Sequence, residues 1–326
     1  MKVAVLGAGA WGTALARLLC DGKNSVTLWG HDASRLGELQ RVKTNEYYLP
    51  GVNLPDSLRY ESNLAPAVRD VECVVVAVPS KAFREVTQGL KEFPGVVVSV
   101  TKGIEHQTGL TMCGVLEQTA PKSERAALSG PSFALEVARG VPTAIVAASD
   151  NSATANAVQD LFHRPTFRVY TSPDVRGVEL GGALKNVIAI AAGVCDGLGF
   201  GDNSKAALVT RAIAEMRRLG VACGAQTETF AGLSGMGDLM VTCFSRLSRN
   251  RGFGERIGQG EKVEAVVNSM TSVAEGVPTA RSARELARKH GVETPIIGEV
   301  YAMLYEGKNV RQAVQDLTTR ESKAED

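Results

Sequence analysis

Lys185 is the one basic residue in VELGGALKNVIAIAAGVCDGLGFGDN, residues 178–203, where alanine, valine and isoleucine surround it. The apolar pattern indicates a buried helix that ends in a glycine-rich turn. No acidic residue stands three or four positions from the lysine, so its own helix cannot neutralise the amine. Gly181 and Gly182 leave room beside it for a ligand. The amine therefore either extends to water along its aliphatic stem or points into a partly desolvated cleft, where it can exchange a proton.

Two segments further along the chain carry groups suited to an anionic substrate. In GLSGMGDL, Asp238 follows a glycine-rich turn, and its carboxylate can either cap a helix or meet a ligand. The next segment, SRLSRNRGFGERIGQG, sets arginines and an asparagine among glycines, namely Arg246, Arg249, Asn250, Arg251 and Arg256. This segment is either a phosphate site built from arginine forks and an amide or a basic face in water.

A glycine turn near the N-terminus indicates a dinucleotide site. VAVLGAGAWGTALARLL contains Gly7-x-Gly9-x-x-Gly12 between a strand pattern and an apolar helix pattern. Gly7 permits the tight turn, Gly9 lets the backbone approach a pyrophosphate, and Gly12 allows close packing of helix and strand. The start of the helix then offers N–H groups and a partial positive charge to the phosphates. An ordinary strand–helix turn is the alternative.

The end of the second strand pattern holds the residues that would distinguish NAD from NADP. In TLWGHD, Asp32 stands about where the dinucleotide fingerprint places an acid that binds the ribose 2′-hydroxyl of NAD. The neighbouring His31 is equally able to face the 2′-phosphate of NADP, and Arg35 and Lys43 follow. A solvated loop is the alternative for both residues. We expect an NAD(P) cofactor, with NADP preferred.

Other strand patterns also end in residues that could meet a ligand, because ligands of open α/β sheets bind beyond the carboxyl ends of the strands. VVVSVTKG ends at Lys102, whose charge could stabilise a developing oxyanion. A surface lysine is the alternative. VVVAVPS and AALSGPSFA end in turns that contain Pro79, Ser80, Gly130, Pro131 and Ser132.

These residues require a sheet to position the glycine turn and helices to position Lys185. The first half of the chain alternates β-rich runs with helical segments, as in a doubly wound, largely parallel sheet. We expect strands at residues 3–6, 25–29, 73–78, 96–101, 126–128, 144–147 and 167–170. Beyond residue 173 the apolar spacing is helical. The sequence thus predicts an α/β fold, with an N-terminal Rossmann-like domain over residues 1–173 and a second, all-helical domain over residues 174–326.

The composition excludes several classes of function. Lys plus Arg (36) nearly equals Asp plus Glu (35), so no overall charge favours nucleic acid or an anionic membrane. The cysteines and histidines form no C-x-x-C or H-E-x-x-H motif, so we expect no metal site and a reducing, cytoplasmic environment. Arg17 and three glycines interrupt the apolar N-terminus, which favours a strand and turn over a signal peptide. We also expect no membrane span.

The motifs together resemble the bacterial NAD(P)-dependent glycerol-3-phosphate dehydrogenases. The resemblance covers almost the whole chain and rests on the glycine turn, VTKGIE, SGPSFALEVARG, LGGALKNVIAIAAGVCDGLGFGDNSKAALVTRAIAEM, TFAGLSGMGDLMVTC, SRLSRNRGFG and VAEGVPTA. It implies a cytoplasmic enzyme that interconverts dihydroxyacetone phosphate and sn-glycerol 3-phosphate for phospholipid synthesis. It further implies a homodimer.

The resemblance also implies roles for individual residues. Lys185 would exchange the proton, Lys102 would contact substrate and cofactor, and Asp238 would hold the substrate and orient Lys185. Further substrate contacts would be Gly130, Ser132, Ser248, Arg249 and Asn250. Cofactor contacts would be Gly7, Gly9, Ala10, Trp11, Gly12, His31, Tyr48, Lys102, Ala134, Arg249, Val273 and Glu275. Relatives have a small hydroxyl residue in place of Ala10, so one hydrogen bond to the cofactor is not expected here.

Three other functions are alternatives to glycerol-3-phosphate dehydrogenase. A reductase of a hydroxy or keto acid could share the two-domain plan, but it would recognise a carboxylate rather than a phosphate. A hydroxyacyl-coenzyme A dehydrogenase would need a His–Glu pair, and no histidine lies near Lys185 in the helical core. A non-catalytic module that senses dinucleotides would bind nucleotide without oxidation, yet it gives no reason for a lysine in residues 178–203.

Overall fold

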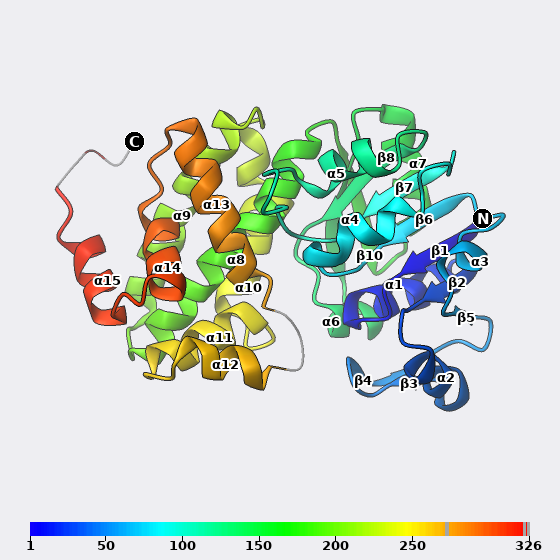
Figure 1. The fold of residues 1–326 in the computed structure, drawn as a ribbon, viewed down its shortest axis with the longest axis horizontal. Helices are drawn as coiled ribbons and strands as arrows, with labels where there is room; N and C mark the ends of the chain where they lie inside the picture. The colour runs from blue at the N-terminus through cyan, green and yellow to red at the C-terminus, as the bar shows by residue number, and fades with distance from the viewer. Residues whose placement is uncertain (271–273, 322–323, 325–326) are drawn as a thin grey trace. The chain divides into compact units, whose positions relative to one another are not determined.

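The computed structural model describes residues 1–270, 274–321 and 324 (Figure 1). The chain forms two compact units. The first comprises Met1–Glu105 and Leu110–Glu179, and the second comprises His106–Gly109 and Leu180–Asp326. The division between Glu179 and Leu180 falls within helix α8 (Val175–Gly197), whereas the predicted domain boundary lies just before that helix.

An eight-stranded sheet forms the centre of the first unit, in the order β10-β9-β8-β7-β6-β1-β2-β5. Its strands are β1 (Lys2–Leu6), β2 (Ser25–Trp29), β5 (Arg59–Glu61), β6 (Cys73–Val76), β7 (Val96–Ser99), β8 (Glu124–Ser129), β9 (Thr143–Ala148) and β10 (Phe167–Ser172). All of the predicted strands are present, although β6 and β7 end two residues earlier than predicted. The edge strand β5 and the small hairpin of β3 (Thr44–Asn45) and β4 (Leu49–Asn53) were not predicted.

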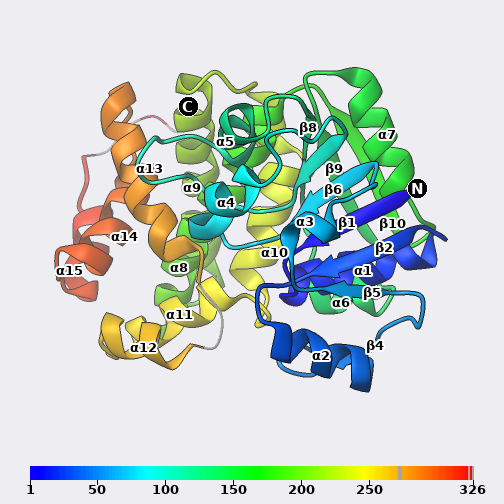
Figure 2. The same cartoon turned by 45° about the vertical axis from the view of Figure 1, so that its right-hand side comes forward.

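Helices cover both faces of this sheet, as Figure 2 shows. On β1, Val3 and Val5 belong to one apolar cluster, and Ala4 and Leu6 belong to another. The first cluster includes side chains of α1 (Ala10–Asp21), α2 (Ala33–Val42) and α7 (Ser152–Phe162). The second includes side chains of α3 (Leu64–Ala67), α4 (Ser80–Gln88) and α5 (Met112–Thr119). The predicted Rossmann-like, doubly wound sheet is therefore confirmed. Strands that are apolar on both faces need a covering layer of helices on each side.

One strand pair departs from the expected parallel arrangement. β8 and β9 are antiparallel, while the other pairs of the large sheet are parallel. Their connection holds only the short helix α6 (Ala134–Ala138). A parallel crossover usually needs a longer helix, so this short connection favours the antiparallel return.

The secondary-structure elements described in the second unit are all helices, as predicted (Figures 1 and 2). From Leu180 onward α8 is followed by α9 (Asp202–Ala222), η1 (Glu228–Ala231), η2 (Leu233–Gly237), α10 (Asp238–Phe244), α11 (Arg249–Gly258), α12 (Val263–Ser269), α13 (Gly276–His290), α14 (Pro295–Tyr305) and α15 (Val310–Thr318). α8 is long and apolar enough to cross a membrane, but 94% of its apolar window is buried inside the protein. Protein neighbours therefore account for its composition.

Glycines allow α11 to approach α8 closely. A Cβ atom on Gly193 of α8 would lie 1.9 Å from the carbonyl oxygen of Arg251. A Cβ atom on Gly254 of α11 would lie 2.0 Å from the carbonyl oxygen of Ile190. The same close approach is repeated one turn later on each helix, at Gly197 and Gly258. This crossing places the first turn of α11 against the middle of α8.

Glu215 of α9 is a buried carboxylate that anchors another helix. It is 3% exposed and accepts hydrogen bonds from the backbone N–H groups of Ile296 (2.7 Å) and Ile297 (3.3 Å) in the first turn of α14. Helix N-termini attract acceptors of this kind because their first N–H groups lack partners within the helix. Burial nevertheless raises the pKa of Glu215 to about 7, with the two hydrogen bonds acting in the opposite direction.

We expect Glu215→Gln to make stability less dependent on pH. The pKa of Glu215 is higher in the folded protein than in the unfolded chain. Its contribution to the free energy of unfolding is therefore fully present below pH 4.5, and it is lost as the pH rises through 7 and the carboxyl ionises. Between pH 5 and 8, the wild-type free energy of unfolding should fall by about 2 kcal/mol relative to the variant in urea titrations. The exposed Glu228 supplies the control, since Glu228→Gln should follow the wild-type profile. Parallel profiles for wild type and Glu215→Gln would contradict this account.

Candidate active site

The glycine turn connects β1 to α1. Gly7 has φ +120°, and a Cβ atom there would lie 2.6 Å from the carbonyl oxygen of Ala77. A Cβ atom on Gly12 would lie 1.9 Å from the carbonyl oxygen of Gly7, so no larger residue can replace Gly12 unless the turn moves. At Gly9, by contrast, no atom lies within 4 Å of the position that a Cβ would take. The turn is thus tight on its inner side and open at Gly9.

This turn fits the phosphates of a dinucleotide. Gly9 is the N-cap of α1, it supplies no side-chain acceptor, and the first turn of the helix, which includes Ala10 and Trp11, has no acidic residue. The start of the helix can therefore donate N–H groups to an anion. β1 lies between β2 and β6, so the strand order reverses beside the turn. Open α/β sheets bind their ligands at such a switch point.

The residues after β2 form a small polar cluster. Asp32 caps α2, because its carboxylate accepts a hydrogen bond from the backbone N–H of Arg35 (3.1 Å). The same carboxylate forms an ion pair with Nε of Arg35 at 3.2 Å. Arg35 also donates a hydrogen bond to the hydroxyl of Tyr48 (3.0 Å), and the preceding His31 is exposed. Helix capping, one of the roles available to an aspartate here, is the role that Asp32 has in this structure.

Three predicted substrate residues of the first unit lie together. Lys102 follows β7, and its Nζ donates a hydrogen bond to the carbonyl oxygen of Gly130 (3.0 Å). The hydroxyl of Ser132 donates to the same oxygen (3.0 Å). Gly130 has φ +150°, a conformation that favours glycine. The carboxyl ends of β7 and β8 thus hold an ammonium and a hydroxyl side by side, with Ala134 beginning α6 just beyond.

The amine of Lys185 is buried in the second unit. The residue is 6% exposed, and its Nζ lies 2.7 Å from Oδ1 of Asp238 and 2.7 Å from the hydroxyl of Thr242. Thr242 donates its own proton to the carbonyl oxygen of Asp238 (2.6 Å), so its hydroxyl is oriented to accept from the lysine. The side chain does not run out to water along its stem. Its counter-charge comes from α10 rather than from its own helix.

The local sequence explains how Asp238 reaches Lys185. A Cβ atom on Gly181 would lie 2.6 Å from the carbonyl oxygen of Ser234, so the π-helical turn η2 packs directly on α8. The expectation that Gly181 leaves room for a ligand is therefore wrong, because backbone fills that space. Thr242 was not predicted, although its place one turn after Asp238 puts it on the same helix face.

Asn250 joins three helices at the first turn of α11. Its side-chain Nδ2 donates to Oδ1 of Asn186 on α8 (2.9 Å). Its side-chain Oδ1 accepts from the backbone N–H of Gly276, at the start of α13 (2.9 Å). Asn186, which directly follows Lys185, was not predicted. The hydroxyl of Ser248 caps α11 and accepts from the backbone N–H of Arg251 (3.2 Å). These bonds fix the predicted substrate residues of α11 relative to α8.

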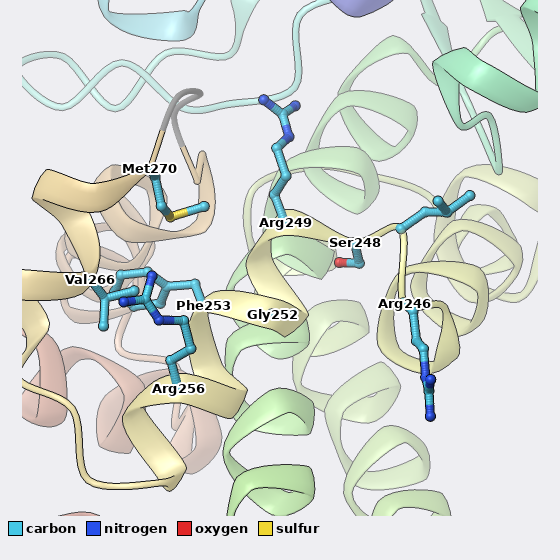
Figure 3. Close-up of a pocket in the computed structure, with 9 residues that line it drawn as sticks. Arg246, Ser248, Arg249, Gly252, Phe253, Arg256, Val266 and Met270 are labelled. Carbon is cyan, nitrogen blue, oxygen red and sulfur yellow. The ribbon is translucent and has the colours of Figure 1, made fainter. Parts of the chain in front are cut away.

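The structure separates the arginines that the sequence places in one segment. Arg251 is buried, with its Nε 2.6 Å from Asp196, and Arg256 donates to Glu261 (2.7 Å). Figure 3 shows Arg246 and Arg249 directed away from each other. The concentrated anion site that was one interpretation of this segment is thus dispersed.

Arg249 is one of the residues that line a cavity of about 260 Å³ between α11 and α12, together with Ser248, Phe253 and Met270 among others (Figure 3). Loss of hydration lowers the pKa of Arg249, and the charge of Glu275 raises it. Val273, a predicted cofactor contact, lies outside the described residues. Within residues 1–270 and 274–321, no group of three or more His, Cys, Asp or Glu side chains is placed to hold a metal ion.

Comparison with known protein families decides where this chain belongs. Residues 2–155 match the family described as "NAD-dependent glycerol-3-phosphate dehydrogenase N-terminus", and residues 174–315 match the corresponding C-terminus. The chain belongs to the NAD-dependent glycerol-3-phosphate dehydrogenase family. The resemblance found in the sequence is confirmed, and so is the dependence on NAD(P) at the level of the family.

Relatives within this dehydrogenase family match over their full length. The chain is 51% identical to "Glycerol-3-phosphate dehydrogenase [NAD(P)+]" of Geobacter sp. (strain M21), over 99% of the chain and 98% of the relative. It is 50% identical to the protein of the same name from Chlorobium limicola, over 100% and 99%. The crystal structure of glycerol-3-phosphate dehydrogenase from Coxiella burnetii is 37% identical, with a TM-score of 0.95 over 98% of this chain and 99% of that one.

Proposed function

We propose that this chain reduces dihydroxyacetone phosphate to sn-glycerol 3-phosphate with NAD(P)H and also catalyses the reverse oxidation. The observation that carries the proposal is the buried amine of Lys185, held at 2.7 Å by both Asp238 and Thr242. A non-catalytic dinucleotide module has no use for such an amine, because burying a charged pair costs free energy that apolar packing would avoid. The names of the curated relatives support the choice of substrate.

Lys185 manages the proton in this proposal. It donates a proton to the ketone oxygen during reduction and takes it back from the alcohol during oxidation. The carboxylate of Asp238 stabilises the ammonium form and burial opposes it, so the pair can support both directions. Thr242 holds the nitrogen in place. When bound, the nicotinamide cofactor supplies or accepts the hydride.

The other site residues bind and orient. Lys102 stabilises negative charge on the substrate oxygen, and the guanidinium of Arg249 binds the phosphate through paired N–H donors. Gly130, Ser132, Ser248 and Asn250 complete the substrate contacts. The cofactor is held by Gly7, Gly9, Ala10, Trp11, Gly12, His31, Tyr48, Lys102, Ala134, Arg249, Val273 and Glu275. We further propose that the enzyme prefers NADP, works in the cytoplasm as a homodimer and supplies phospholipid synthesis.

An absorbance assay at 340 nm tests this function. With NADPH or NADH, dihydroxyacetone phosphate should be reduced, and unphosphorylated dihydroxyacetone should have a kcat/KM lower by about 10³-fold or more, because the phosphate contacts are charge-assisted. A 2-keto acid serves as the competing substrate. Preference for the keto acid would favour the alternative reductase, and nucleotide binding without turnover of either substrate would favour the sensing module.

A further inference from the structure

We propose that Arg35 is the residue with which this chain distinguishes NADP from NAD, by binding the 2′-phosphate. The inference deepens the proposed function and rests on the use of a nicotinamide cofactor. The end of β2 lies beside the glycine turn, since the backbone N–H of Gly7 donates to the carbonyl oxygen of Trp29 (2.9 Å). In dinucleotide folds of this type, the adenosine ribose binds at the end of the second strand.

The guanidinium of Arg35 is held in one orientation. Its Nε lies 3.2 Å from Asp32, its Nη1 donates to the hydroxyl of Tyr48 (3.0 Å), and its Cζ lies 4.3 Å from the ring centroid of Tyr47. Stacking on an aromatic ring and pairing through fixed N–H donors are the interactions for which arginine is suited. The side chain remains 46% exposed. A guanidinium has five N–H donors, so donors remain for a ligand after these contacts.

Asp32 is poorly placed to select NAD. An aspartate at the end of β2 can bind the 2′-hydroxyl of NAD through its carboxylate. Here one carboxylate oxygen accepts the backbone N–H of Arg35, and the other faces Nε of the same arginine. The nearby Lys43 has its own partner, Asp56, at 3.8 Å. Arg35, although paired with Asp32, keeps further N–H donors in its guanidinium, and it can meet a 2′-phosphate together with the exposed His31.

The discriminating experiment measures binding of adenosine 2′,5′-bisphosphate and adenosine 5′-monophosphate to the full chain by calorimetry. Arg35→Gln should weaken the bisphosphate roughly tenfold or more, because a charge-assisted contact is lost, and should change the monophosphate less than about twofold. Arg35→Lys keeps the charge but not the planar set of N–H donors, so its affinity for the bisphosphate should lie between those of wild type and Arg35→Gln. Arg41→Gln is the matched control, since Arg41 is exposed on the same helix and its replacement changes the net charge equally.

Asp32→Asn provides a test in the opposite direction. Asparagine still caps α2, but it removes the negative charge beside Arg35, so the bisphosphate should bind a few times more tightly. Equal weakening of both nucleotides by Arg35→Gln would overturn the proposal, as would wild-type protein that binds the two nucleotides equally. Neither measurement contains dihydroxyacetone phosphate. A wrong assignment of the substrate would therefore leave these results unchanged.

Discussion

Lys185→Ala is expected to lose most of its turnover while the protein still binds NADPH. The variant removes the proton donor of the reduction, and a positioned general acid contributes about 10²- to 10⁴-fold to the rate. We therefore expect kcat for dihydroxyacetone phosphate to fall by about 10³-fold, measured by absorbance at 340 nm. The dissociation constant of NADPH, measured by fluorescence, should stay within a few-fold of wild type. Near-normal turnover would refute the role assigned to Lys185.

A second variant separates lost chemistry from lost stability. Lys185→Ala removes the ammonium that neutralises the buried carboxylate of Asp238, and breaking a buried ion pair typically costs about 3–5 kcal/mol. The double variant Lys185→Met, Asp238→Asn removes both charges, so its free energy of unfolding should recover toward wild type. Its turnover should remain low. If the double variant were both stable and active, neither residue would manage the proton.

Gly254→Ala is expected to cause a large loss of stability. The added Cβ would lie 2.0 Å from the carbonyl oxygen of Ile190, and neither atom can rotate away, because the helix backbones fix both positions. The two helices must separate, so we expect the free energy of unfolding to fall by about 3 kcal/mol or more, at the upper end of single-substitution effects. Urea denaturation followed by far-ultraviolet circular dichroism would measure the change, because both tryptophans, Trp11 and Trp29, lie in the first unit and would not report on the helices of the second.

Gly252→Ala is the matched control for this prediction. Gly252 lies in the same helix, and no atom lies within 4 Å of the position that an added Cβ would take. Alanine in place of glycine within a helix usually stabilises by about 0.5–1 kcal/mol, so the two substitutions should have opposite signs. Only stability is compared, because Gly252 lines the cavity beside Arg249. Similar effects at both positions would mean that the contact between α8 and α11 is not as tight as described.

Features that depend on neighbouring residues could be predicted from the amino-acid sequence alone. Alternating strand and helix patterns predicted the doubly wound sheet, because each strand must be apolar on both faces to lie between two helical layers. The glycine turn was identifiable because Gly7 and Gly12 meet steric demands of their own segment. Lys185 was conspicuous for the same local reason, as a charge within a helix that must be buried.

Contacts between groups far apart in the sequence could be identified only from the folded chain. The partners of Lys185 are Asp238 and Thr242 on another helix, and no local pattern encodes a contact between residues so far apart in the sequence. The same limit applies to the arginines, since Arg251 is neutralised by Asp196 of α8 while Arg249 is not part of that pair. The apolar pattern around a residue predicts whether its side chain is buried, and the residue type determines whether it is charged. Which atoms neutralise it is set by how helices cross, and here that crossing depends on the glycines of α8 and α11.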